Sequence, residues 1–351
     1  MSKWIDFPLA ERKVMIQRVV SDRNIDEKSA EEDWWVTAVL YALFHTSMAE
    51  YLLFKGGTSL SKGWNIINRF SEDLDLALDR RFFLEVRNEK CANCTSNTQI
   101  HHLREKSQDF ILGEFKEELK SKLAEMGLTS ADVYGENECP GSEGSPAKIA
   151  HDKDPNVIFV KYPSLYDDGK ESYAVPVVKI EISVLSMSEP FEPRPISSLI
   201  NQAFSADGIT VDDDYAMMIN TVSPSRTFLE KAFLLCEEYQ KAEPRTRRMT
   251  RHFYDLERQM DTDYAKSALA NTALYKEIVA HREKFYHVGY VDYTKELPQT
   301  ISILPPDTLR SAYASDYEEM RRSFIYAESL SFKALMERIS ELQRRFRQIE
   351  M

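Results

Sequence analysis

The sequence contains no long apolar run. Nowhere in its 351 residues do about eighteen apolar residues follow one another, which is the length that a membrane-spanning helix requires. Residues 1–22 mix lysine, arginine and acidic side chains among the apolar ones, so they also lack the apolar core of a secretory signal peptide. We therefore predict a cytoplasmic protein that does not associate with a membrane.

Cysteine is scarce as well, and four cysteines are too few for a disulfide scaffold in a chain of this size. They are Cys91, Cys94, Cys139 and Cys236. The first two have the spacing of zinc ligands and are followed by His101 and His102, but these two histidines are adjacent rather than about three to five residues apart. We interpret Cys91 and Cys94 as free thiols and expect no structural zinc.

Positive charge is also in deficit, because 45 lysines and arginines face 57 acidic residues and leave a net charge of −12. This balance argues against a broad surface that coats nucleic acid. One basic cluster remains, at residues 241–251. Such clusters are more often solvated faces than binding sites, and contact with tRNA or a nucleotide is the alternative interpretation here.

What the chain does contain is a change of apolar periodicity along its length. Helical spacing predicts helices at residues 9–22, 31–48, 58–67 and 98–126. Short apolar runs and alternation predict strands at 51–55, 74–78, 157–162 and 174–185, the last two joined by a turn around Asp167-Asp168-Gly169.

The composition changes again towards the second half of the chain. Residues 130–155 are rich in Gly, Pro, Ser and Asn and predict a loop, and a proline-rich segment follows at 190–195. Beyond about residue 221 only helices are predicted. We therefore expect an α/β (α+β) fold in which residues 1–190 form a mixed sheet flanked by helices and residues 191–351 form a mainly helical domain.

The most informative pattern joins a glycine turn to two acids. A strand ends at Gly56-Gly57, a helix follows, and the next strand presents Asp73 and Asp75. Glycine lets the backbone approach a phosphate, and the amides at a helix start attract an anion. Side chains two residues apart on a strand share one face, so both aspartates can hold the magnesium ions that phosphoryl transfer needs.

A later strand offers a third carboxylate. Its apolar residues 178, 180 and 182 face one way, which puts Lys179 and Glu181 on the other face. We predict that Glu181 completes the metal site. Lys179 is expected either to meet a phosphate or to tune the carboxylate.

Two longer runs make the interpretation specific. The runs FKGGTSLSK at 54–62 and RFSEDLDL at 69–76 resemble the signature of the AbiEii-like abortive-infection nucleotidyltransferases, a branch of the polymerase-beta-type superfamily. Proteins of this family are the toxins of bacterial toxin–antitoxin pairs. Shorter pieces that fit in chain order are EDWWV at 32–36, TQI at 98–100, EKA at 230–232 and RHFYDL at 251–256. The resemblance thus covers most of the chain from residue 32 to 256.

The resemblance implies an enzyme that moves a nucleoside monophosphate from an NTP to an acceptor, with Mg²⁺ or Mn²⁺ as cofactor. The acceptor would be the 3′ end of a tRNA or a protein, and an antitoxin would be the partner. Metal binding falls to Asp73 and Asp75, with Glu181 as the third ligand. Nucleotide binding is assigned to Gly56, Gly57, Thr58, Ser59, Lys62, Lys179, Lys231, Arg251 and Asp255. A small-molecule, antibiotic-type nucleotidyltransferase and a non-catalytic nucleotide-binding protein on the same fold remain as alternatives.

Lys231 is the expected phosphate anchor in the helical half. Thr227 stands three residues before Glu230, which predicts a capping box that opens the helix containing Lys231. We therefore expect Lys231 in the first turn of that helix, near its positive end. The nucleotide would lie in a cleft between the two domains, where Lys231 faces the two aspartates.

Overall fold

The computed structural model describes residues 3–71, 73–139, 148–166, 176–212 and 215–351. The chain folds as two compact units, of which the first comprises Met1–Gly63 and Ser71–Thr221 and the second comprises Trp64–Phe70 and Val222–Met351. Residues 191–221, which we expected in the helical domain, belong to the first unit because two of their segments are strands of its sheet. In the described part of the chain, no helix is both long and apolar enough to cross a membrane.

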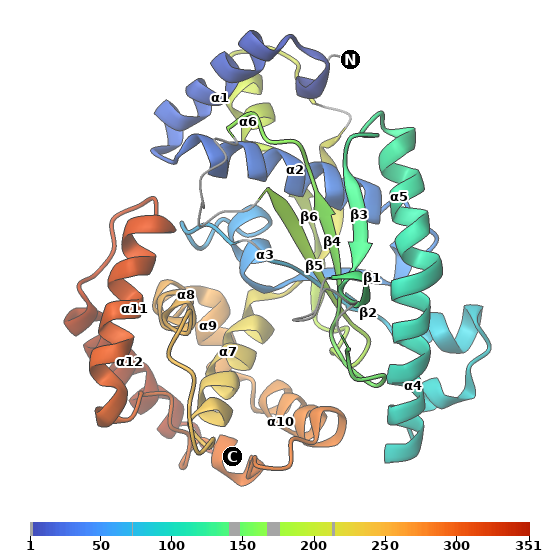
Figure 1. The fold of residues 1–351 in the computed structure, drawn as a ribbon. Coiled ribbons are helices and arrows are strands. Elements are labelled where there is room, and N and C mark those ends of the chain that lie inside the picture. The colour runs from blue at the N-terminus through green and yellow to red at the C-terminus, as the bar shows by residue number, and fades with distance from the viewer. Residues whose placement is uncertain (1–2, 72, 140–147, 167–175, 213–214) are drawn as a thin grey trace. The chain divides into compact units, whose positions relative to one another are not determined.

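A mixed sheet of seven strands, counted within the described residues, forms the framework of the first unit (Figure 1). Its strand order is β3-β4-β5-β2-β1-β7-β6. β2 is antiparallel to β1 and parallel to β5, so the three strands that carry the predicted site are direct neighbours. The strands are β1 (Leu52–Lys55), β2 (Asp73–Leu78), β3 (Asp132–Gly135), β4 (Asn156–Lys161), β5 (Val177–Ser183), β6 (Phe191–Ile196) and β7 (Met217–Val222).

The strands predicted from periodicity are confirmed as β1, β2, β4 and β5. In β2 and β5 the side chains of Leu74, Leu76, Ile180 and Ile182 are fully buried, as the alternation requires. The predicted turn at Asp167-Asp168-Gly169 lies outside the described residues.

Three strands were not predicted, namely β3 and β6 at the sheet edges and the inner strand β7. β3 falls inside the segment that we expected to be a loop. It is four residues long and forms its ladder with β4 alone. β6 contains Pro193 and Pro195 and occupies the opposite edge of the sheet. Proline is tolerated there because an edge strand has a neighbour on one side only. β3 and β6 lack the apolar alternation by which β2 and β5 were found.

Helices α1 (Leu9–Arg23), α2 (Glu27–Leu43), α3 (Gly56–Lys62), α4 (Asn97–Phe110), α5 (Lys116–Glu125) and α6 (Leu199–Ser205) complete the first unit. α2 begins earlier than predicted because Asp26 caps it, its carboxylate accepting a hydrogen bond from the Ser29 amide at 2.9 Å. Trp34 and Trp35 of α2 are buried in the core. α4 and α5 form the predicted long helix and run along the β3 side of the sheet (Figure 1).

Short 3₁₀ and π turns connect the helices and strands of both units. The 3₁₀ turns are η1 (Trp4–Asp6), η2 (Ala49–Tyr51), η4 (Lys90–Asn93), η6 (Glu136–Glu138), η9 (Tyr293–Glu296) and η10 (Asp307–Leu309). The π turns are η3 (Phe82–Val86), η5 (Ile111–Phe115) and η8 (Arg282–Tyr286). η5 continues α4 into α5 without a break.

The second unit is helical, as predicted. It contains α7 (Pro224–Glu238), α8 (Thr250–Gln259), α9 (Asp263–Ala270), α10 (Thr272–His281), α11 (Arg310–Ser323) and α12 (Phe332–Arg347). The segment Trp64–Phe70 joins it through an isolated bridge between Arg69 and Ile325.

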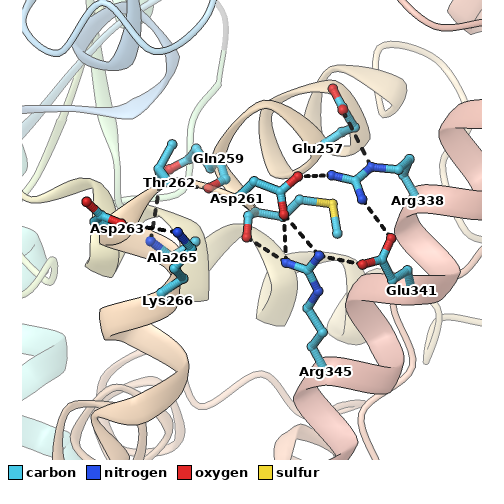
Figure 2. A network of polar contacts seen from close by, with 11 residues as sticks. Glu257, Gln259, Asp261, Thr262, Asp263, Ala265, Lys266, Arg338, Glu341 and Arg345 are labelled. Atoms are coloured by element: carbon cyan, nitrogen blue, oxygen red, sulfur yellow. Dashed lines mark hydrogen bonds and ion pairs between the residues drawn. The ribbon is translucent and has the colours of Figure 1, made fainter.

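A charged network fixes α12 against the end of α8. Figure 2 shows Arg338 and Arg345 of α12 reaching Asp261, which follows α8. Both arginines also pair with Glu341 one turn away on their own helix. Because several charges share the two guanidinium groups, the network holds the helix ends together better than isolated surface pairs do.

Candidate active site

The strands β1, β2 and β5 bring the predicted site residues onto neighbouring positions. Asp75 lies opposite Lys55 of β1 and beside Glu181 of β5, and Asp73 lies beside Lys179. Directly opposed residues on adjacent strands point to the same face of a sheet. Two acids of β2 and one of β5 therefore share a face, as the alternation predicts.

Lys179 lies among these acids. Its Nζ is 3.2 Å from Oδ1 of Asp73 and also donates a hydrogen bond to Oε1 of Glu181. Partial burial by itself would lower the pKa of Lys179, but the negative charges of Asp73 and Glu181 outweigh it and raise that pKa above its ordinary value. The lysine is therefore charged and offsets part of the acidic charge on this face.

The donor chemistry of the acids fits magnesium. Among the described residues, no group of three or more His, Cys, Asp or Glu side chains is arranged to hold a metal ion by itself. Magnesium commonly binds through one or two carboxylates and completes its shell with water and substrate phosphates, rather than in an all-protein cage. Asp73 and Asp75, with Glu181 beside them, supply oxygen donors for such a shared site.

Gly56 is required where the first strand turns into α3. Its φ is +78°, a left-handed conformation that L side chains rarely adopt. A Cβ added to this residue would lie 1.9 Å from Oδ2 of Asp75. The glycine therefore leaves the space that the Asp75 carboxylate occupies, so the Gly-Gly turn and the acidic pair form one structural feature.

The polar groups of Thr58, Ser59 and Lys62 are committed within the fold. The Thr58 hydroxyl donates to the Asp73 carbonyl at 2.6 Å, and the Ser59 hydroxyl donates to the Gly56 carbonyl at 2.9 Å. Lys62 forms a buried ion pair with Asp33 of α2, with Nζ and Oδ1 2.5 Å apart. These contacts fix α3 to β2 and to α2. The nucleotide contacts of Thr58, Ser59 and Lys62 stay a prediction.

In the second unit, Lys231 and Asp255 form a buried cluster with Arg69. Arg69 donates to both oxygens of Asp255 at 2.7 Å, and Lys231 Nζ lies 2.9 Å from Oδ2. Burial by itself would raise the pKa of Asp255, but the two cations lower it well below its usual range. Asp255 is therefore ionised and holds both cations in fixed positions.

The expected capping box before Lys231 is wrong. α7 begins at Pro224 and is capped by Ser223, whose hydroxyl oxygen accepts a hydrogen bond from the Ser225 amide at 3.3 Å. Proline suits the first helical position because it has no amide hydrogen to leave unpaired, and this signal precedes the Thr227 motif. Lys231 consequently lies about two turns into the helix and not at its positive end.

The basic cluster at residues 241–251 is partly neutralised. Lys241 and Arg245 both pair with the buried carboxylate of Glu238, at 2.9 and 2.6 Å. Arg251 is half-buried on α8, one turn before Asp255. Part of the cluster therefore serves the fold of the second unit.

Cys91, Cys94 and His101, which have the residue types of a zinc site, lie apart from the groups described above in the sequence. Cys91 and Cys94 are free thiols in and just after η4, and Cys94 is buried. His101 of α4 faces Glu105 and Asp152, with N–O distances of 3.6 and 3.5 Å.

Two residues of these clusters were not assigned a role from the sequence. Lys55 precedes the glycine turn and lies opposite Asp75, but this pairing depends on the register of two separate strands and leaves no pattern in the sequence. Its Nζ donates to the Ser186 hydroxyl at 2.6 Å. Arg69 lies in the short segment Trp64–Phe70, where no periodicity signals its partner.

The site thus combines Asp-x-Asp on β2, Glu181 beside it on β5, and a Gly-Gly turn that precedes them in the chain. The family described as the nucleotidyl transferase AbiEii toxin of type IV toxin–antitoxin systems matches residues 38–338, and the chain belongs to this family. The resemblance predicted from the runs at 54–62 and 69–76 is thereby confirmed, although Glu72 in the second run lies outside the described residues.

Among solved structures, the fold is similar to that of MenT4, a nucleotidyltransferase toxin from Mycobacterium tuberculosis H37Rv. The identity is 14%, the TM-score is 0.45, and the similarity covers 98% of this chain and 100% of MenT4. No protein with a curated description matches the chain.

Replacing Gly56 by alanine is expected to destabilise the first unit. The added Cβ meets the Asp75 carboxylate and the positive φ is strained, so we expect a loss of more than about 2 kcal/mol in the free energy of unfolding. Gly113→Ala is the control, because a Cβ there meets nothing within 4 Å and alanine favours a helix by roughly 0.5–1 kcal/mol. Denaturant unfolding measures both, and equal stability of the two variants would contradict the steric role of Gly56.

Asp255→Asn is expected to destabilise the second unit by about 3–5 kcal/mol, because it leaves two buried cations without their anion. Asp263→Asn, at a fully exposed carboxylate, should change stability by less than about 0.5 kcal/mol. The folded-state pKa of Asp255 is lowered, so its contribution is complete above about pH 4 and is lost as the pH falls. The difference in the free energy of unfolding between wild type and Asp255→Asn should therefore become smaller as the pH falls. A difference that stays constant down to pH 2 would exclude this electrostatic origin.

Proposed function

We propose that this protein is a metal-dependent nucleotidyltransferase that moves a nucleoside monophosphate from an NTP to an acceptor hydroxyl and releases pyrophosphate. The observation that carries the proposal is the register of β2 and β5, in which Asp75 lies beside Glu181 and Asp73 beside Lys179. Membership of the AbiEii family supports the reaction class.

Each residue of the acidic face has a proposed task. Asp73 and Asp75 would hold Mg²⁺ or Mn²⁺, and Glu181 would be the third carboxylate. When bound, the metal neutralises the triphosphate and activates the attacking oxygen. Gly56 keeps the Asp75 carboxylate in place by leaving room for it, and Lys179 supplies a positive charge for a phosphate.

The buried cluster of the second unit supports a role for Lys231 through Asp255. A lysine side chain is flexible, and an ionised partner that is itself fixed by Arg69 limits the positions of its ammonium group. We propose that Lys231 and Arg251 bind nucleotide phosphate and that Asp255 positions Lys231. The Lys62, Thr58 and Ser59 side chains are better explained as supports of α3.

We further propose that the protein is a cytoplasmic toxin with a cognate antitoxin, and that its acceptor is the 3′ end of a tRNA or a protein. The family supports the toxin role. The net charge of −12 and the pairing of Lys241 and Arg245 with Glu238 favour an acceptor that is contacted locally over one that is bound along an extended basic surface.

Asp73→Asn and Asp75→Asn should each abolish transfer while leaving the fold intact. The amide is nearly isosteric but neutral, and a lost metal ligand should lower the rate on the order of a hundredfold or more. Each labelled NTP is incubated with Mg²⁺ and either total tRNA or the protein alone. Asp132→Asn removes an exposed carboxylate from the edge strand β3 and should retain full activity. Normal transfer by both site variants would remove the acidic pair from the active site.

Expression of the protein in a bacterial host should slow growth, and Asp73→Asn should not. Growth curves with matched amounts of soluble protein measure the difference. If the wild-type protein and the variant allow equal growth, the toxin role is wrong, whereas the transfer reaction is tested separately by the labelled NTPs.

A further inference from the structure

The ammonium group of Lys179 lies between carboxylates of the acidic face, which is the face of the sheet shared by Asp73, Asp75 and Glu181. It contacts Asp73 of β2 at 3.2 Å and donates to Glu181, its neighbour two residues along β5. The lysine thereby bridges an acid from each of two parallel strands. Its side chain is 35% exposed, so part of it is accessible to solvent.

This bridge has an electrostatic consequence. Three carboxylates on adjacent positions repel one another, and an ammonium group held between two of them relieves part of that repulsion. A divalent ion that binds Oδ1 of Asp73 competes with the lysine for that oxygen. A displaced ammonium group loses the two carboxylate contacts that it makes here, and another anion can replace them.

We propose that Lys179 is a resident counter-ion that keeps the acidic face closed to a divalent metal until a nucleotide arrives. The triphosphate supplies both missing parts, because its oxygens complete the metal shell and accept the ammonium released from Asp73 and Glu181. Metal and nucleotide therefore bind cooperatively, and the protein selects the metal–nucleotide complex over the free metal. This inference rests on the proposed function of the Asp73–Asp75 face.

Lys179→Met tests the proposal, because methionine keeps much of the length of the side chain and removes its charge. Binding of Mn²⁺ alone, without nucleotide, is measured from the electron paramagnetic resonance signal of the free ion. Removing a charge-assisted contact that competes with the metal should tighten Mn²⁺ binding roughly ten- to hundredfold. The gain should disappear when Asp73→Asn is added to the Lys179→Met variant.

Lys161→Met is the matched control. Lys161 is an exposed lysine of β4, in the same sheet, so its replacement removes the same charge without opening the acidic face. We expect Mn²⁺ affinity unchanged. An equal gain in Lys161→Met and Lys179→Met would overturn the proposal, because the effect would then reflect net charge alone.

A second measurement covers the case in which Lys179→Met weakens the fold. Its Tm without metal should be lower than that of wild type because the carboxylates lose their counter-ion, and Mn²⁺ should raise it by more than it raises the wild-type Tm. A variant whose Tm does not respond to Mn²⁺ more than wild type contradicts the counter-ion role.

The cooperativity gives a third readout. With a non-hydrolysable NTP analogue, Mn²⁺ affinity of the wild-type protein should rise by a larger factor than that of Lys179→Met. Tighter Mn²⁺ binding by the variant in a protein that transfers no nucleotide would reject the proposed function and keep the counter-ion. If the wild-type protein transfers nucleotide but Lys179→Met leaves Mn²⁺ affinity unchanged, the proposed function stands and the counter-ion role is rejected.

Discussion

Repulsion between like charges on the face shared by β2 and β5 is the constraint on which the arrangement of the candidate site depends. Asp73, Asp75 and Glu181 occupy adjacent positions of a sheet whose other face is the core, so none of them can be moved without moving a buried leucine or isoleucine. Two residues stabilise this arrangement of carboxylates. Lys179 lies between two of the acids, and Gly56 leaves room for the third, so the carboxylates are kept in place before any ligand is bound.

The second unit meets the opposite problem, because its buried cluster has more positive than negative charge. One carboxylate, that of Asp255, serves both Arg69 and Lys231. Burial of His252 together with the neighbouring Lys231 and Arg251 lowers the histidine pKa well below its usual value, so the imidazole adds no further charge. In each unit, therefore, an ionisable residue of the family motifs is held by a partner of opposite charge.

The sequence was most informative where one short segment fixes both periodicity and chemistry. The strands β2 and β5 and the shared face of Asp73, Asp75 and Glu181 follow from alternation, since a strand with one buried face allows a single register, and β1 follows from its short apolar run. The edge strands β3 and β6 and the inner strand β7 were missed because their apolar and polar residues do not alternate as clearly as those of β2 and β5. The start of α7 was misplaced because Thr227 and Glu230 imitate a capping box, whereas Ser223 and Pro224 provide the actual helix start. Ion pairs such as Lys62–Asp33 join residues far apart in the chain and leave no local pattern.

The short segment Trp64–Phe70 determines how the two units are joined by the chain. It belongs to the helical unit, although residues of the sheet unit precede and follow it. The backbone therefore passes from one unit to the other three times, after Gly63, after Phe70 and after Thr221. Neither unit is a continuous piece of sequence, so a single cut cannot release either of them whole. A fragment that begins at Val222 would lack Arg69 and leave Asp255 with one cation fewer. Exchange of the helical unit between proteins by a single crossover in the gene would therefore leave its Trp64–Phe70 segment behind.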